Sequence, residues 1–192
     1  VVRAETFDPA AEIDAVLQHD ISEAKLLDVK ATPAIYVEGR HVDSLVMMDA
    51  LALAVEEGVD AVVDIATLTG AVLVALGPAT AGLFGNEPGI IEQVKAAGAA
   101  VDEPVWQLPL EKKYRKTLDS EVADIANLGG PYAGSTTAAL FLAEFVGEVP
   151  WAHIDIAGTM NVDADESWRS KGATGYGARL LAELARDFTP KA

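Results

Sequence analysis

Two apolar segments that run into turns of small residues constrain the fold of this chain most strongly. Residues 59–66 are followed by Thr67-Leu68-Thr69-Gly70, and residues 151–156 by Ala157-Gly158-Thr159-Met160. Both segments have the length and the β-branched content of buried strands. If the strands are parallel neighbours, both turns open at one edge of a sheet, where α/β proteins collect their ligands. We therefore expect a binding site at these turns, with Gly70 and Gly158 admitting a ligand close to the backbone.

Strand and helix patterns alternate over most of the chain, which indicates an α/β fold. Strand patterns cover residues 59–66, 79–84, 105–108 and 151–156. Helical patterns cover residues 45–56, 88–101, 111–118, 136–146 and 176–188, and the first of these is apolar on nearly all sides, so we expect it to be buried. The sequence predicts a mixed, mainly parallel sheet flanked by helices.

A different pattern precedes this domain. Residues 8–28 have helical spacing, Pro33 marks a bend, and two short strand-like segments are joined by Glu38-Gly39-Arg40. We expect an N-terminal helix–hairpin appendage.

Composition excludes several classes of function. The 14 basic and 30 acidic residues give a formal charge of −16, which disfavours nucleic acid and anionic membranes as partners. No apolar run approaches the ~18 residues that span a bilayer, and charged residues near the start differ from a secretory pattern. Because the chain has no Cys, any metal must be held by carboxylates, carbonyls, Lys or the three His residues. We expect a cytoplasmic protein.

A series of motifs resembles the C-terminal part of the catalytic domain of the leucyl aminopeptidase family. They occur in the family's order over residues 45–192, at positions 45–52, 64–71, 122–127, 133–142, 151–160 and 171–175. The resemblance implies metal-assisted hydrolysis of the N-terminal peptide bond, with a peptide N-terminus as substrate. It also implies two divalent metals, Mn or Zn, and assembly into homo-oligomers.

The same resemblance assigns substrate-binding roles to residues of the two turns. The backbones of Thr67, Leu68 and Gly70 would hold the main chain of the substrate. Its first side chain would lie in a pocket lined by Ile125, Ala157 and Met160. An apolar pocket with a few backbone partners suits a neutral residue.

The metal-holding motifs of the family match this chain poorly. Their nearest counterpart is residues 34–40, in which Glu38 corresponds to a metal ligand and Arg40 to a catalytic residue, whereas Tyr36 replaces a ligand Asp. The upstream motifs with Lys and Asp have no counterpart in residues 1–33. We therefore expect a metallo-exopeptidase domain that is inactive as an isolated chain.

A second resemblance offers another explanation for Glu38 and Arg40. Residues 20–29, 31–34 and 37–40 resemble the last helix and hairpin of DsbA-like thioredoxin-fold proteins. On this interpretation the chain divides into a thioredoxin-like segment (1–44) and an aminopeptidase-like portion (45–192), as in a gene fusion or an engineered chimera. Glu38 and Arg40 are then a hairpin tip, and a non-catalytic assembly or interaction module is the alternative function.

Three other groups of polar residues have structural explanations. Asn161, Asp163, Asp165 and Glu166 lack the Gly and Glu positions of a calcium loop, so we expect a solvated acidic loop over residues 158–172. His153 alternates with apolar residues on a strand and is expected to be a hydrogen-bonded core or interface residue and not a metal ligand. Ser135 has no nucleophile elbow, so it does not predict a hydrolytic triad with His153 and Asp155.

Overall fold

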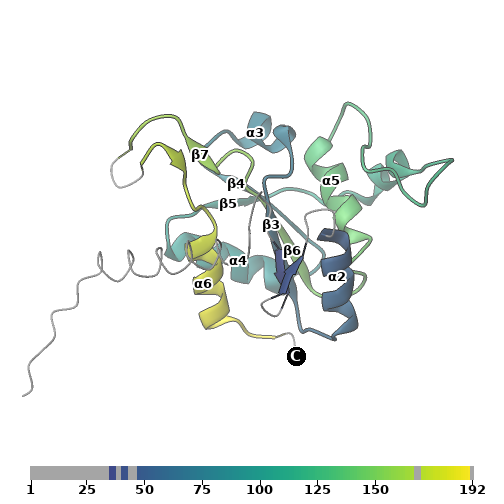
Figure 1. Ribbon diagram of the computed structural model, residues 1–192, viewed down its shortest axis with the longest axis horizontal. Coiled ribbons are helices and arrows are strands. Elements are labelled where there is room, and N and C mark those ends of the chain that lie inside the picture. The colour runs from purple at the N-terminus through teal and green to yellow at the C-terminus, as the bar shows by residue number, and fades with distance from the viewer. Residues whose placement is uncertain (1–34, 38–39, 43–46, 167–169, 191–192) are drawn as a thin grey trace, which may run out of the picture. The chain divides into compact units, whose positions relative to one another are not determined.

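The computed structural model describes residues 35–37, 40–42, 47–166 and 170–190 (Figure 1). Within the N-terminal unit, strands β1 (Ile35–Val37) and β2 (Arg40–Val42) pair antiparallel, with Tyr36 opposite His41. This confirms the predicted hairpin. The helix predicted over residues 8–28, the bend at Pro33, and Glu38 lie outside the described residues.

The second unit is built on one sheet of four strands. These are β3 (Val62–Ala66), β4 (Ala81–Gly85), β5 (Val105–Gln107) and β6 (Trp151–Asp155), in the order β3-β6-β4-β5. The β3–β6 and β4–β5 pairs are parallel, whereas β4 and β6 are antiparallel. The mixed, mainly parallel sheet flanked by helices is confirmed.

Helices cover both faces of this sheet (Figure 1). On one face, α4 (Pro88–Ala100) and α6 (Ala178–Asp187) pack together over an apolar core that includes Leu83 and Ile154. On the other face, α5 (Gly134–Ala143) contacts β4 and β6, and α3 (Gly70–Leu76) contacts β4 and α5. Because side chains alternate along a strand, the odd-numbered residues of β6 point to the face away from Ile154.

A buried carboxylate from another part of the chain caps the N-terminus of α6. Glu103 is only 3% exposed, and its Oε2 accepts hydrogen bonds from the N–H groups of Gly177 (3.1 Å) and Leu180 (2.9 Å). Its Oε1 accepts a bond from Arg179 Nε at 3.2 Å. A negative charge at this helix end satisfies N–H groups that have no partner within the helix.

The packing of Tyr176 beside this cap predicts a loss of stability at high pH. Burial raises the pKa of Tyr176 from 10.0 to about 12, and the nearby charges of Glu103 and Asp102 act in the same direction. Because the pKa in the folded chain exceeds that in the unfolded chain, this contribution is fully present below pH 10 and is lost as the pH rises towards 12. Urea unfolding between pH 9 and 12 should show this decline. Tyr176→Phe should flatten it, and an equally steep decline in that variant would contradict the assignment.

Two helical predictions were only partly right. Helix α2 (Met47–Glu56) forms, but among its residues whose burial is described, 48–56, only Ala50 and Leu51 are buried, and Leu53 is 40% exposed. The expectation that this helix is buried on nearly all sides was therefore wrong. The charged helix predicted over residues 111–118 is a 3₁₀-helix, η2 (Lys112–Leu118), with Glu111 as its N-cap.

Two further elements differ from the sequence prediction. The segment after β3 contains a helix, α3, where the sequence predicted only a turn. The acidic loop predicted over residues 158–172 contains two paired strands, β7 (Asn161–Val162) and β8 (Gly172–Ala173). Its acidic residues Asp163, Asp165 and Glu166 are exposed between them, which agrees with the solvated loop that was expected.

Candidate functional site

The parallel pairing of β3 and β6 brings the two predicted turns to the same edge of the sheet. Ala66 lies opposite Asp155 at the ends of the strands, and Ile156 N–H donates to the Ala66 carbonyl oxygen at 2.9 Å. The expectation that both turns open at one edge is confirmed. Carboxyl ends of adjacent parallel strands are where α/β domains place ligands.

Thr69 converts the end of β3 into the start of α3. Its backbone is extended, with φ −133° and ψ 134°, and its Oγ1 accepts a hydrogen bond from Val72 N at 3.1 Å. This is the geometry of a helix N-cap. The residues between β3 and α3 thus form a short turn, residues 67–69, whose far end is fixed by the helix cap.

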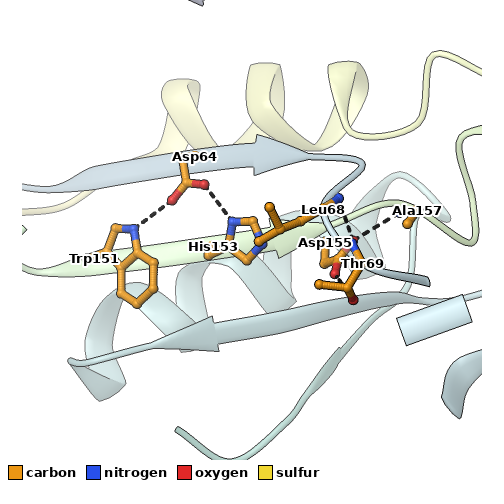
Figure 2. A network of polar contacts seen from close by, with 7 residues as sticks. All are labelled: Asp64, Leu68, Thr69, Trp151, His153, Asp155 and Ala157. Atoms are coloured by element: carbon orange, nitrogen blue, oxygen red, sulfur yellow. Dashed lines mark hydrogen bonds and ion pairs between the residues drawn. The ribbon is translucent and has the colours of Figure 1, made fainter. Parts of the chain in front are cut away.

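The carboxylate of Asp155 ties this turn to β6 (Figure 2). Asp155 is 1% exposed, and its Oδ1 accepts hydrogen bonds from the backbone N–H groups of Leu68 (3.1 Å), Thr69 (3.4 Å) and Ala157 (3.1 Å). Its Oδ2 accepts the hydroxyl of Thr69 at 2.7 Å. A buried carboxylate requires several such donors to replace water. The two turns are therefore held together by one side chain.

A second carboxylate, that of Asp64, lies further back along the strands and is partly buried. The Oδ2 of Asp64 accepts Trp151 Nε1–H at 2.6 Å, and Asp64 Oδ1 lies 2.5 Å from His153 Nδ1 (Figure 2). His153 is fully buried and its ring stacks between Phe84 and Trp151. The prediction that His153 is a hydrogen-bonded core residue is confirmed.

These contacts agree with the rejection of a hydrolytic triad. The hydroxyl of Ser135 lies 3.0 Å from Thr69 Oγ1, whereas His153 is bonded to Asp64. His153 Nε2 has no hydrogen-bond partner among the described residues. None of the three side chains therefore bonds directly to another, and Ser135 and Asp155 share only the hydroxyl of Thr69 as a partner.

The structure brings together some of the predicted substrate-binding residues. Leu68 and Ala157 share Asp155 as a partner. Thr67, the first residue of the turn, and Gly70, the residue after it, are both exposed. A Cβ built on Gly70 would meet nothing within 4 Å. Met160 follows the β6 turn and is 43% exposed.

The remaining predicted residues are not tied to these turns. Ile125 is partly buried in the segment between η2 and α5, where Ala126 N–H donates to the carbonyl of Leu118. Arg40 lies in β2, in the other unit of the chain. Glu38 lies outside the described residues.

Gly158 has a different role from the one expected. A Cβ at this position would lie 2.3 Å from the carbonyl oxygen of Gly77, the residue that ends α3. The close approach that Gly158 permits is therefore to the chain's own backbone. The expectation that this glycine admits a ligand was wrong, because α3 occupies that space.

The described residues do not fit a dinuclear metal centre. Among them, no group of three or more His, Cys, Asp or Glu side chains is placed to hold a metal ion. Asp155 and Asp64 are fully engaged with donors from the chain itself. In the acidic loop, Asp165 Oδ1 accepts a hydrogen bond from the backbone N–H of Lys171 at 2.8 Å.

The fold and the two joined turns define an α/β domain with a binding edge at the carboxyl ends of parallel strands. The chain belongs to the cytosol aminopeptidase family, whose catalytic domain matches residues 20–182. This family is metal-dependent and acts on peptide N-termini. The match confirms the resemblance seen in residues 45–192, and it also extends into the segment that resembles DsbA-like proteins.

Curated relatives with the name probable cytosol aminopeptidase are closely similar. The protein from Roseiflexus castenholzii is 46% identical over 166 residues, which are 86% of this chain and 33% of the relative. The protein from Synechococcus sp. strain JA-3-3Ab is 47% identical over 169 residues, which are 87% of this chain and 32% of the relative. The protein from Geobacter sulfurreducens is 48% identical over 149 residues, which are 78% of this chain and 29% of the relative. The chain thus spans about a third of the length of these relatives. No helix in the described part of the chain is both long enough and apolar enough to cross a bilayer.

Proposed function

We propose that this chain supplies the peptide-binding wall of a metal-dependent aminopeptidase. The N-terminal part of a peptide lies along the backbones of Thr67, Leu68 and Gly70, at the edge of the sheet. The observation that supports this most strongly is the tie formed by Asp155, because it holds the β3–α3 turn beside the β6 turn in one rigid surface.

The first side chain of the peptide is placed beside the β6 turn. Met160 is exposed next to Ala157, so an apolar side chain bound there buries surface without displacing a core residue. Ile125, from the segment before α5, completes this pocket in the proposal. A pocket of this kind favours a neutral N-terminal residue such as leucine.

The hydrolytic step is assigned to groups other than the described residues. The family is metal-dependent, and we propose that the hydrolytic site uses two divalent metals, Mn or Zn. The described donors do not fit such a pair. Glu38 and Arg40 are the proposed metal ligand and catalytic residue within this chain. Because these alone cannot surround two cations, we propose that the chain by itself binds peptides and does not hydrolyse them.

The setting of this function follows the family. The relatives are described as cytosol aminopeptidases, and we propose a cytoplasmic location and a homo-oligomeric assembly for this chain. We propose a boundary near residue 44 between a thioredoxin-like segment and the aminopeptidase-like portion. A gene fusion or an engineered chimera is the proposed origin of this boundary.

Titration of the chain with leucine amide tests the binding wall. We expect saturable binding, and we expect Met160→Asp to weaken it about tenfold or more, because a charge placed in an apolar pocket loses the contact with the leucyl side chain. Val59→Asp, which adds the same charge ahead of β3 and away from the turns, is the matched control and should leave the Kd unchanged. Equal Kd values for all three proteins would contradict the pocket.

Hydrolysis of a leucyl chromogenic substrate with added Mn²⁺ or Zn²⁺ tests the assignment of the metals. We expect no turnover and no stoichiometric metal. Turnover that is lost on Glu38→Gln would overturn the proposed inactivity and make Glu38 a metal ligand. If neither leucine amide nor metal binds, the non-catalytic assembly module becomes the better explanation.

A further inference from the structure

The binding-wall proposal leaves unexplained why a buried carboxylate lies at the meeting point of three elements. Asp155 ends β6, bonds to the start of α3 through Thr69, and reaches α5 through Ser135. We propose that Asp155 is a positioning residue that orients the peptide planes of the β3–α3 turn towards a bound peptide. Asp155 also fixes the direction of a row of two hydroxyl hydrogen bonds, in which Ser135 donates to Thr69 and Thr69 donates to Asp155. This inference rests on the proposed binding of peptides at the turn.

The orientation of the peptide planes follows from two hydrogen bonds. The N–H groups of Leu68 and Thr69 both point at Asp155 Oδ1. In a trans peptide the carbonyl points opposite to the N–H, so the carbonyl oxygens of Thr67 and Leu68 face away from Asp155. The turn therefore presents acceptors on its other side. These are complementary to the N–H donors of a peptide main chain.

The direction of the hydroxyl row follows from the chemistry of the carboxylate. Three N–H groups and one hydroxyl converge on the two oxygens of Asp155, which is the arrangement of an acceptor-only group. Thr69 must then donate its only proton to Asp155 Oδ2, and the 2.7 Å distance is typical of a charge-assisted bond. Thr69 Oγ1 already accepts from Val72 N–H. Its remaining lone pair can only accept, so Ser135 is the donor across the 3.0 Å contact.

This row connects the turn to a second rigid element. Ser135 is buried in the first turn of α5, which packs against β4, β6 and α3. The turn is thus held from β6 by the carboxylate and from α5 by a hydroxyl. An element held from two sides keeps its geometry before a ligand arrives, which lowers the ordering cost of binding.

Asp155→Asn reverses the row without removing it. The amide oxygen can still accept from the N–H groups, whereas the amide nitrogen must donate to Thr69 Oγ1. Thr69 must then donate its proton to Ser135. Ser135→Ala removes only an accepted bond of Thr69 in the natural chain, but in the Asp155→Asn background it removes the sole acceptor of the partly buried Thr69 hydroxyl. Unsatisfied buried donors are costly.

A double-mutant cycle measured by urea unfolding tests this direction. We expect Ser135→Ala to raise the unfolding equilibrium constant less than about threefold in the natural chain, and about tenfold in the Asp155→Asn background. Equal effects in both backgrounds would overturn the one-way row. If Asp155→Asn does not fold, Thr69→Val tests the contact on which the row depends. Ser135 then has no partner at position 69, so Ser135→Ala should raise the constant no further. A rise as large as in the natural chain would overturn the Ser135–Thr69 hydrogen bond and with it the row.

The positioning role is tested by NMR and by leucine amide binding at conditions where each variant is folded. We expect Asp155→Asn to shift the amide protons of Leu68 and Thr69 upfield and to raise the Kd for leucine amide about tenfold, because both peptide planes are held less firmly. A merely structural carboxylate would change stability and leave the Kd of the folded protein unchanged. Asp119→Asn is the same exchange at an exposed carboxylate paired with Arg115. It should change neither the amide shifts of Leu68 and Thr69 nor the Kd for leucine amide.

The outcomes separate this inference from the proposed function. Shifted amides with an unchanged Kd would overturn the positioning role, and unshifted amides would overturn the orientation of the planes. If the natural chain binds no leucine amide, the binding wall and the positioning role fall together. The unfolding cycle still decides the direction of the hydroxyl row in that case.

Discussion

Gly158→Ala should lower the free energy of unfolding by about 3 kcal/mol, the upper end of the range for overpacking. A Cβ at this position would lie 2.3 Å from the Gly77 carbonyl oxygen and 3.6 Å from Leu73 Cα. Both neighbours are backbone atoms of α3 or its cap, so no side chain can rotate to make room. The helix must move away from β6, which also disturbs the turn at its N-terminus. Urea unfolding followed by far-UV circular dichroism measures the change.

Gly70→Ala is the matched control for this prediction. The new Cβ would meet nothing within 4 Å, and Gly70 opens the same helix. Because Ala is a better helix former than Gly by up to about 1 kcal/mol, this variant should be as stable as the natural chain or slightly more so. Equal losses in the two variants would show that the contact between Gly158 and Gly77 does not limit the packing of α3.

Asp64→Ala should destabilise the fold by about 3 kcal/mol, because it leaves two buried ring nitrogens without a partner, at about 1–3 kcal/mol each. Trp151 Nε1–H and His153 Nδ1 both lose their partner, at 2.6 Å and 2.5 Å from the carboxylate oxygens. His153 cannot compensate by exchanging its tautomer, because Nε2 has no partner in the described part of the chain either. Both rings are fully buried, whereas the Asp64 side chain is 13% exposed, so water that reaches this position offsets part of the loss.

Two variants separate the roles of the partners in this cluster. Trp151→Phe removes one donor but leaves the Asp64–His153 contact, so it should cost less than Asp64→Ala. Asp64→Asn keeps one acceptor for Trp151, and its amide N–H₂ forces His153 to accept at Nδ1 and to place a proton on the unpartnered Nε2. We expect a stability between those of the natural chain and Asp64→Ala. A thermal unfolding midpoint for Asp64→Ala that equals that of Asp64→Asn would contradict this account.

Sequence periodicity was sufficient to place the sheet and most of its helices. The strands at residues 62–66 and 151–155 were expected because apolar runs of this length end in small residues, and the structure pairs them as parallel neighbours. Helix α3 was missed because residues 70–76 form a short apolar run with several β-branched side chains, and periodicity cannot assign such a run. The N-cap residue Thr69 was the available indication of a helix start.

The polar ties of the site could not be derived in the same way. Asp64 and Asp155 were visible as charges within apolar strands, but apart from Ala157 their partners come from residues more than 80 positions away. Which donors meet which carboxylate depends on a register fixed only when the strands pair. The role of Gly158 was mistaken for the same reason, since its neighbour Gly77 belongs to the helix that the sequence pattern did not show.

The cap that Glu103 provides to α6 limits how this chain can be divided. The N-cap of α6 is Gly177, which has no side chain to bond the free N–H groups of the first turn. The carboxylate that bonds them belongs to Glu103, 74 residues before Gly177 and 77 residues before Leu180. A fragment that starts after Glu103 would contain an amphipathic helix without its cap, and one that stops before Gly177 would bury a charge without its donors. Fragments cut between these positions should therefore fold only when mixed, as complementing halves of one protein.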